Sequence, residues 1–504
     1  MITADRMARV DANAAALGVP RKQLMESSGN AVARVVRDLV DPGGRVVLVC
    51  GRGNNGGDGF VAARFLRSYD TETVLLGRPS EIGTEIAAEN WEALNAAELS
   101  MTTIGDSTHI EDLDLDSADC VVDAMLGTGI RGALREPTAS AAVAINATDA
   151  TVVAVDVPSG VDSDTGDAAG RAVEADHIVT FHDTKPGLAE LDTPVTVADI
   201  GIPAAAERFV GPGDLPDTRR APASHKGDHG ELLVVGGGPY TGAPALAGQA
   251  ALRAGADLVH IACPAPVADR IQGYSENLIV HSFDGERLTP AAVEFCVDLA
   301  AEVDCVVCGP GLGDHPDTLA AVGAFLSSVS GRVVVDADAL AVVPDVDTDA
   351  KLLCTPHQGE LVSMGGETAT DWQTRAALVD EFATELGVTL LVKGAYDIAS
   401  APNRSTQNAA RSTQNAARPT ENAGRPTTRV NRTGTPAMTV GGTGDVLSGV
   451  VGSLFTRHDS LTASAVGAYV TGLAGERASE TRHTGLVATD LLDWLPESFE
   501  RTNE

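Results

Sequence analysis

The sequence has little positive charge. Only 36 of its 504 residues are Lys or Arg, against 70 Asp or Glu, so the formal charge is −34, and only five residues are lysines. This balance excludes a general affinity for nucleic acids or anionic membranes, because both attract cationic surfaces. A strongly acidic surface is typical of a halophilic protein from a salt-rich cytoplasm, where ions screen the repulsion between its charges.

Long hydrophobic runs and cysteine pairs are also scarce. No stretch reaches the roughly 18 consecutive apolar residues of a membrane-spanning helix, and the N-terminus lacks the charged-then-apolar order of a secretory signal. We therefore expect a cytoplasmic protein with no membrane partner. The seven cysteines are an odd number and argue against a disulfide framework. Cys305 and Cys308 lie in an apolar run that indicates a strand, where residues three apart point to opposite faces.

Short valine-rich runs alternate with alanine-rich stretches along almost the whole chain, which is typical of parallel α/β architecture. Helices are expected at 21–39, 444–456 and 461–478. A segment dense in Gly and Pro at 211–224 interrupts the alternation and indicates a domain boundary. We therefore predict two α/β domains, residues 1–215 and 219–504. The main predicted strands are 45–50, 73–77, 120–126, 151–157, 177–181 and 195–201 in the first domain, and 231–238, 305–311, 332–338, 351–356 and 390–394 in the second.

A seven-residue repeat breaks this pattern. The repeat occupies residues 404–425: RSTQNAA, RSTQNAA and RPTENAG follow one another, and RPTTR begins at Arg425. It lacks the apolar positions of a coiled coil. The stretch 403–432 holds six arginines against one acid, so it is locally basic. We predict that 401–430 is a disordered surface insert. A specific binding segment is the alternative, supported only by its charge.

Polar side chains follow three predicted strands of the first domain. The turn GRGNNGGDGF (51–60) precedes a helical stretch, VAARFLRS, an arrangement that builds anion or nucleotide sites from unpaired backbone N–H groups. Asp58 in this turn repels a phosphate and suits a cation, a hydroxyl or an amide better. Asp123 precedes a GTG turn, and Asp156 lies at the end of a further strand. Because the carboxyl ends of such strands converge on one crevice, we expect a single site there.

The motifs GxGNNGGDG, DAxLGTG and VDVPSGxD resemble those of the NAD(P)H-hydrate epimerase domain over about residues 1–215. The resemblance implies a potassium ion held by Asn55, Asp123 and Ser159. The damaged cofactor carries a hydroxyl at C6 beside the ring nitrogen, so losing and regaining water through an iminium-like state inverts that carbon. Asp156 is the acid/base candidate, with a role confined to binding as the alternative. The implied substrate contacts are Asn54, Asn55, Gly56, Gly57, Asp58, Gly127, Thr128, Gly129, Ile130, Arg131, Gly132, Ala133 and Asp156.

The second domain carries its own glycine turn. In GGTGDVLSG (441–449), glycines and a threonine lead into a helix whose first N–H groups can hold a phosphate. Asp445 in the first turn suits the removal of a proton from a group that is being phosphorylated. A helix-capping acid is the alternative. Further signals are GPGLG (309–313), DADAL (336–340), TPHQGE (355–360) and VKGAYD (392–397). No glycine turn continues into GK[ST], so an ordinary P-loop is not indicated.

This set is similar to the ribokinase-like superfamily, and specifically to ADP-dependent NAD(P)H-hydrate dehydratases, over about 219–504 apart from the insert. The resemblance implies that Asp445 deprotonates the hydrate hydroxyl, ADP phosphorylates it, and phosphate leaves to give NAD(P)H and AMP. Mg²⁺ is expected for phosphoryl transfer, without identified ligands. The motif KGAYD ends in Asp where the family usually has Thr, which puts the nucleotide contact of Asp397 in doubt. His357 is alternatively a loop histidine with a structural role. The implied contacts are Lys393, Gly394, Ala395, Tyr396, Asp397 and Gly444 to the nucleotide, and Ala243, Gly311, His357 and Asp445 to the hydrate.

The sequence therefore predicts a Rossmann-like three-layer domain followed by a ribokinase-like α/β domain. Together they form a bifunctional isomerase and lyase that repairs NAD(P)H hydrate, with K⁺, Mg²⁺ and the cosubstrate ADP. One alternative is a vitamin or sugar kinase with an accessory domain, and another is a noncatalytic first domain that only binds. We expect a homo-oligomer of undetermined size. The preferences for NADH or NADPH, and for ADP or ATP, stay open.

Overall fold

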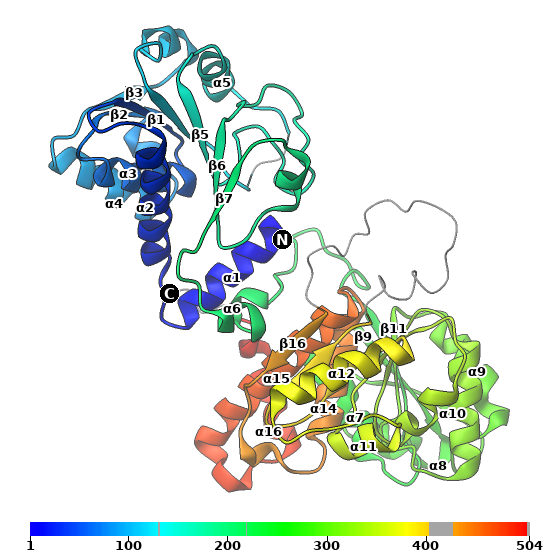
Figure 1. Ribbon diagram of the computed structural model, residues 1–504. Helices are drawn as coiled ribbons and strands as arrows, with labels where there is room; N and C mark the ends of the chain where they lie inside the picture. Colours follow the sequence, from blue (N-terminus) through cyan, green and yellow to red (C-terminus); the bar gives the residue numbers. More distant parts are fainter. Residues whose placement is uncertain (130–131, 218, 403–426, 501–504) are drawn as a thin grey trace. The chain divides into compact units, whose positions relative to one another are not determined.

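The computed structural model describes residues 1–129, 132–217, 219–402 and 427–500 (Figure 1). The chain divides into two compact units, Met1–Glu207 and a second unit that begins at Arg208. Each unit has its own sheet and its own hydrophobic core. The division falls a few residues before the Gly- and Pro-rich segment, and the predicted limits of the two functional domains, 215 and 219, stay predictions.

The first unit contains a seven-stranded sheet of order β3-β2-β1-β4-β5-β6-β7, and all its strands pair in parallel. The order reverses between β1 and β4, where neighbouring connections leave toward opposite faces. This is the predicted Rossmann-like architecture, although β3 was not predicted. The strands are β1 (Arg45–Cys50), β2 (Asp70–Leu76), β3 (Met101–Ile104), β4 (Cys120–Ala124), β5 (Thr151–Val155), β6 (His177–Phe181) and β7 (Val195–Ala198).

Helices cover both faces of this sheet, so its strands are apolar on both sides. Val46, Leu48 and Cys50 of β1 enter the core under α1 to α4, while Val47 and Val49 enter the core under α5. Figure 1 shows α2, α3 and α4 together on one side of β1. The helices are α1 (Ala4–Ala16), α2 (Arg21–Leu39), α3 (Asn54–Phe65), α4 (Glu85–Ala96), α5 (Thr138–Asn146) and α6 (Ala204–Arg208).

The second unit contains a nine-stranded sheet of order β10-β9-β8-β11-β12-β13-β14-β15-β16, parallel except for its last two pairings. The insert was predicted to be disordered as far as residue 430, but Thr428–Asn431 forms β16 and pairs with β15, so the last predicted residues of the insert belong to the sheet. The repeats at 404–425 lie outside the described residues. The strands are β8 (Glu231–Val235), β9 (Leu258–Pro264), β10 (Ile279–Phe283), β11 (Cys305–Cys308), β12 (Arg332–Val335), β13 (Lys351–Cys354), β14 (Thr389–Val392), β15 (Asp397–Ser400) and β16 (Thr428–Asn431).

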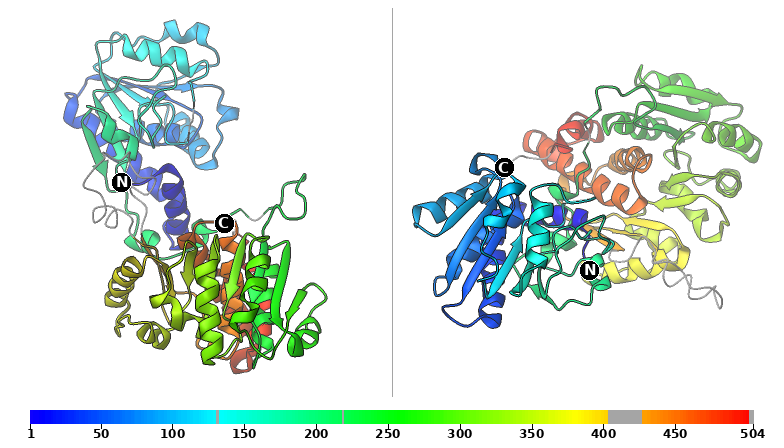
Figure 2. Two further views of the ribbon diagram at one scale, coloured as in Figure 1. Left: turned by 90° about the vertical axis from the view of Figure 1, so that its right-hand side faces the viewer. Right: turned by 90° about the horizontal axis from the view of Figure 1, so that it is seen from above.

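Two helical layers enclose this second sheet. Helices α7 and α14 to α16 pack on one face, and α9 to α12 pack on the other; Figure 2 shows the late helices gathered in orange and red. Cys305 belongs to the first core and Cys308 to the second, so the two thiols face opposite sides as predicted. All seven cysteines are buried and free. The helices are α7 (Gly242–Arg253), α8 (Ala265–Gln272), α9 (Val293–Ala300), α10 (Pro316–Ser328), α11 (Gln358–Ser363), α12 (Trp372–Leu386), α14 (Thr443–Phe455), α15 (Ser460–Arg482) and α16 (Ala488–Ser498).

Short 3₁₀ helices complete the connections. Across the described ranges, no helix is both long enough and apolar enough to span a bilayer. The 3₁₀ segments are Pro79–Glu81, Ser107–Asp112, Pro186–Glu190, Pro212–Asp214, Pro290–Ala292, Ala337–Asp345, Pro436–Met438 and His483–Gly485.

The contact between α7 and α14 generates a stability prediction. A Cβ on Gly449 of α14 would lie 2.0 Å from the carbonyl oxygen of Ala247, whereas a Cβ on Gly323 of α10 would meet nothing within 4 Å. We expect Gly449→Ala to lower the free energy of unfolding by about 1–3 kcal/mol through overpacking. Gly323→Ala, the matched control, should raise it by roughly 0.5–1 kcal/mol because alanine favours the helix. Urea unfolding of both variants measures this, and equal effects would contradict it.

Candidate functional site

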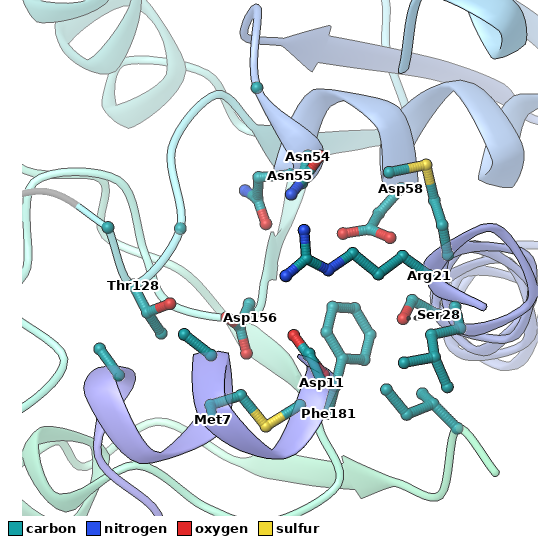
Figure 3. A pocket seen from close by; sticks show the side chains of 18 of the residues that line it. Met7, Asp11, Arg21, Ser28, Asn54, Asn55, Asp58, Thr128, Asp156 and Phe181 are labelled. Carbon is teal, nitrogen blue, oxygen red and sulfur yellow. Dashed lines mark hydrogen bonds between the residues drawn. The ribbon is translucent and has the colours of Figure 1, made fainter. Parts of the chain in front are cut away.

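A pocket of about 480 Å³ opens at the carboxyl ends of the central strands of the first unit. Its walls come from α1 and α2, from the start of α3, and from the loops after β4 and β5. Figure 3 shows the side chains of Asp11, Arg21, Asp58 and Asp156 directed into one space. The pocket therefore lies at the reversal of strand order, where ligands bind in open α/β sheets.

The glycine turn after β1 lets two backbones approach closely. A Cβ on Gly51 would lie 1.8 Å from the carbonyl oxygen of Met125, beyond the end of β4. Helix α3 then begins at Asn54, inside the motif, and not at Val61 as the predicted helical stretch implied. Asn54 and Asn55 are thus in the first helical turn, where free backbone N–H groups also point toward a ligand.

The structure brings together most of the residues implied for the substrate. Ile130 and Arg131 lie outside the described residues. Gly132 and Ala133 are exposed and do not belong to the pocket wall. Gly56 and Gly57 lie in close packing contacts, because a Cβ on Gly56 would collide with Gly51 and a Cβ on Gly57 with Met25. Their predicted contact with the substrate stays a prediction. The implied residues that line the pocket are Asn54, Asn55, Asp58, Gly127, Thr128, Gly129 and Asp156.

Asp123 forms a buried polar cluster with Ser159 behind the pocket wall. Its carboxylate accepts hydrogen bonds from Ser159 Oγ at 2.6 Å, from Ser159 N at 2.8 Å and from Met125 N at 3.2 Å. Burial raises the pKa of Asp123 to about 6, although these hydrogen bonds oppose the shift. The amide nitrogen Nδ2 of Asn55 is buried without a partner in the described structure.

Asp156 follows β5 in a left-handed backbone conformation, with φ of 66°. This conformation is uncommon for a residue with a side chain and is found at functional sites. Its Oδ1 lies 2.7 Å from Lys185 Nζ and accepts a hydrogen bond from Thr180 Oγ1 at 3.0 Å. The lysine side chain is only 1% exposed and the aspartate 14% exposed. A buried cation therefore pairs with the acid that faces the pocket.

Three further charged groups at this pocket were missed by the sequence reasoning. They are Asp11 of α1, Arg21 of α2 and Lys185, which follows β6. Burial raises the pKa of Asp11, and it raises that of Asp58 well above its ordinary value, with the charge of Asp156 adding to both shifts. The scarcity of lysine was the one available signal for Lys185.

The second unit gathers charged residues at the carboxyl edge of its sheet. Lys393 follows β14, and its Nζ lies 3.1 Å from Asp336 Oδ1 and 3.8 Å from Glu360 Oε2. Burial by itself would lower the pKa of Lys393, but these two carboxylates outweigh it and raise the pKa. Asp336 is 2% exposed and also accepts a hydrogen bond from Thr355. Asp336 and Glu360 lie in the DADAL and TPHQGE motifs, but neither was assigned a role.

Asp445 lies in the first turn of α14, beside this cluster. Burial raises its pKa to about 7; the negative charge of Asp336 adds to the shift and Lys393 opposes it. A Cβ on Gly444 would lie 3.5 Å from Lys393 Nζ. The turn GGTGD and the lysine therefore face each other.

His357 and the residues after Lys393 have structural partners. His357 caps α11: its ring Nδ1 accepts a hydrogen bond from the backbone N–H of Glu360 at 3.0 Å, and its own backbone N–H donates to Glu360 Oε2 at 2.7 Å. Asp397 accepts from Gly394 N and from Asn431 Nδ2, so its two oxygens stabilise the turn. Tyr396 stacks on Trp372, with ring centroids 5.6 Å apart.

The remaining implied residues occupy two places. Gly394 and Ala395 are exposed beside Lys393. Gly311, after β11, approaches Ala243 of α7, whose Cβ would lie 3.3 Å from a Cβ on the glycine. This second place is the strand reversal between β8 and β11. Within the described parts of both units, no cluster of three or more His, Cys, Asp or Glu side chains is arranged to hold a metal ion.

Comparison with known proteins matches both halves of the chain. The family model described as YjeF-related protein N-terminus matches residues 21–187, and the model described as NAD(P)H-hydrate dehydratase matches 232–421 and 422–497. The ADP/ATP-dependent NAD(P)H-hydrate dehydratase of Bacillus subtilis, crystallised with ATP and Mg²⁺, is 26% identical, with a TM-score of 0.45, and the match covers 56% of this chain and 94% of that chain.

Full-length relatives match as well. The bifunctional NAD(P)H-hydrate repair enzyme of Pyrobaculum aerophilum is 42% identical, and the match covers 99% of this chain and 98% of the relative. The enzyme of the same name from Methanothermobacter thermautotrophicus is 40% identical, with 98% of this chain and 94% of the relative covered. The predicted resemblance is confirmed: the chain belongs to the family of bifunctional NAD(P)H-hydrate repair enzymes.

Proposed function

We propose that this protein repairs damaged nicotinamide cofactors in two steps. The first unit epimerises the R and S forms of NAD(P)H hydrate, and the second dehydrates the S form to NAD(P)H with ADP, giving AMP and phosphate. One observation carries the proposal: each unit places a carboxylate and a lysine together at the carboxyl edge of its sheet. Two relatives that match almost the whole chain are named bifunctional NAD(P)H-hydrate repair enzymes, which supports the proposal.

The epimerase chemistry fits the pocket of the first unit. In the hydrate, the C6–O bond breaks as the hydroxyl receives a proton and leaves as water, while the electron pair of N1 forms the C6=N1 bond. Water then adds to the opposite face of C6 and releases a proton, so the reaction neither consumes nor produces protons overall. We assign this proton to Asp156, which lines the pocket. Backbone N–H groups at Asn54 and Asn55 suit the diphosphate.

A potassium ion fits behind this pocket. The donor set is Asn55 Oδ1, the Asp123 carboxylate and Ser159 Oγ, which are hard oxygen ligands. Ser159 Oγ accepts from Leu126 N at 3.0 Å, which leaves it a second lone pair. A cation there would balance the buried charge of Asp123 and hold the loops after β4 and β5 together.

The dehydratase chemistry fits the cluster of the second unit. Asp445 takes the proton of the C6 hydroxyl, the oxygen forms a bond to the β-phosphorus of ADP, and AMP leaves. The phosphorylated C6 then expels phosphate, and loss of the C5 proton restores the double bond. Lys393 faces the transferred phosphate, where its charge stabilises the transition state. Mg²⁺ would enter with the nucleotide, held largely by phosphates and water.

The cellular setting follows from composition. We propose a salt-rich cytoplasm, because the charge of −34 keeps the protein soluble there. The protein is proposed to act on free cofactor hydrate and ADP as a homo-oligomer without nucleic-acid or membrane partners.

Recovery of reduced cofactor from a racemic hydrate tests both activities. With ADP in concentrated KCl, absorbance at 340 nm should recover from more than half of the hydrate, because the R form is converted before dehydration. Asp156→Asn should slow recovery of the second half at least 100-fold, while the first half stays fast. Recovery that stops at half in the unaltered protein would assign the first unit a binding role. No recovery with either ADP or ATP would favour the kinase alternative.

The pH dependence of dehydration tests Asp445 as the base. Because the base acts in its ionised form, the rate on S-hydrate should rise with pH through about 7, the pKa of Asp445. Asp336→Asn removes a like charge, which lowers that pKa and moves the rise to lower pH. Asp317→Asn, at an exposed position, is the matched control. A rise at the same pH in Asp336→Asn would be inconsistent with this electrostatic coupling.

Exchange of monovalent cations tests the potassium site. At equal ionic strength, KCl in place of NaCl should raise both the epimerisation rate and the unfolding temperature of the first unit. Asp123→Asn should abolish the difference between the two salts, because the buried charge that the cation balances is gone. Asp114→Asn, at an exposed position, should keep the difference. Equal behaviour of the original protein in both salts would remove the site from the proposal.

A further inference from the structure

Lys185 forms an unusually complete set of contacts beneath the first pocket. Its ammonium lies 2.7 Å from Asp156 Oδ1 and donates to Thr180 Oγ1 at 2.8 Å and to the carbonyl oxygen of Phe181 at 3.0 Å. The carbonyl oxygen of Asp183 lies at 3.4 Å. An ammonium has three protons, so these oxygens use all of them. Burying a lysine this deeply is costly unless its charge is paired, and Asp156 provides the pairing.

The same contacts fix the orientation of Asp156. Oδ1 is held by Lys185 and by Thr180, while no protein group in the described ranges is hydrogen-bonded to Oδ2. The left-handed backbone of Asp156 brings its side chain to the pocket wall. One oxygen is thus anchored and the other is available to a ligand.

The charges around Asp156 explain why the anchor is a cation. Asp58 of α3 and Asp11 of α1 both face Asp156 and both interact with Lys185. Arg21 of α2 and His182 also interact with Asp11, and both favour its ionised form. With three carboxyl groups close together, Lys185 is the buried cation that allows Asp156 to carry a negative charge after it has released a proton.

We propose that Lys185 is a positioning residue for the epimerase reaction: it holds Asp156 through Oδ1 and stabilises its carboxylate while Oδ2 exchanges the proton with the C6 hydroxyl. This inference rests on the proposed epimerase function. When Asp156 gives its proton to the departing hydroxyl, the new carboxylate is paired with Lys185 on one side and faces the iminium cation on the other. The proton returns to Oδ2 from the water that adds to C6.

The test is the approach of pure R-hydrate to the R/S equilibrium without nucleotide, which makes the readout independent of the second unit. Lys185→Met should lower kcat at least 100-fold and leave KM within about threefold. The limb of the pH–rate profile that Asp156 controls, identified by its loss in Asp156→Asn, should move to higher pH by about one unit or more. This direction follows because the carboxylate loses the cation that stabilises it. Lys22→Met, at an exposed lysine of the same unit, is the matched control.

Two further variants keep the test decisive if Lys185→Met does not fold. Lys185→Arg retains the charge and should restore the position of the pH limb, even where kcat stays reduced. Thr180→Val removes the hydroxyl between lysine and aspartate and should move the limb in the same direction by a smaller amount. A purely structural role would change unfolding temperature without moving the limb, and that result overturns the inference. Absence of epimerisation in the original protein would instead overturn the proposed function.

Discussion

Both sites depend on the close approach of two backbones at the carboxyl ends of neighbouring parallel strands, β1 and β4 in the first unit and β11 and β12 in the second. A Cβ on Gly51 would lie 1.8 Å from the carbonyl oxygen of Met125, and a Cβ on Gly309 would lie 1.9 Å from that of Asp336. Neither distance leaves room for a side chain, so the loops that carry the site residues can meet only at glycine. In the first unit this contact positions the start of α3 against the loop after β4. In the second it fixes Asp336 beside the loop after β11, and Lys393 then pairs with it.

A lysine at the carboxyl edge of each sheet is unusual for a chain with so little positive charge. Its formal charge is −34 and it has only five lysines, yet Lys185 and Lys393 each lie within 3.1 Å of an aspartate at the carboxyl edge of a sheet. Electrostatic interactions are stronger there than at the surface, because protein replaces water and salt screens buried pairs much less. Each of these two lysines therefore forms a close ion pair with an aspartate at the edge of its sheet.

Most of the strands, the strand-end motifs and the two-part organisation could be predicted because they depend on local sequence, whereas β3, β15 and β16 were missed. Valine-rich runs indicated both sheets, and the carboxyl ends of parallel strands converge whatever their loops contain. Asp11 and Lys185 could not be assigned to the pocket, because α1 reaches it only through tertiary packing and Lys185 stands outside the recognised motifs. His357 is both an N-cap and an implied contact, and sequence does not separate these roles. The start of α3 was misplaced because its first turn is rich in glycine and asparagine, which are poor helix formers.

The two units use a lysine differently. In the first, Lys185 contacts Asp156 of the pocket directly, so the proposed proton carrier and its counter-ion form one pair. In the second, Lys393 pairs with Asp336 and Glu360, and no ion pair joins Asp445 to a cation within the described ranges. Burial raises the pKa of Asp445 to about 7. A base with that pKa is best matched to proton removal near neutral pH. In the proposed function, the same pair of residue types serves reversible proton exchange in one unit and phosphoryl transfer in the other.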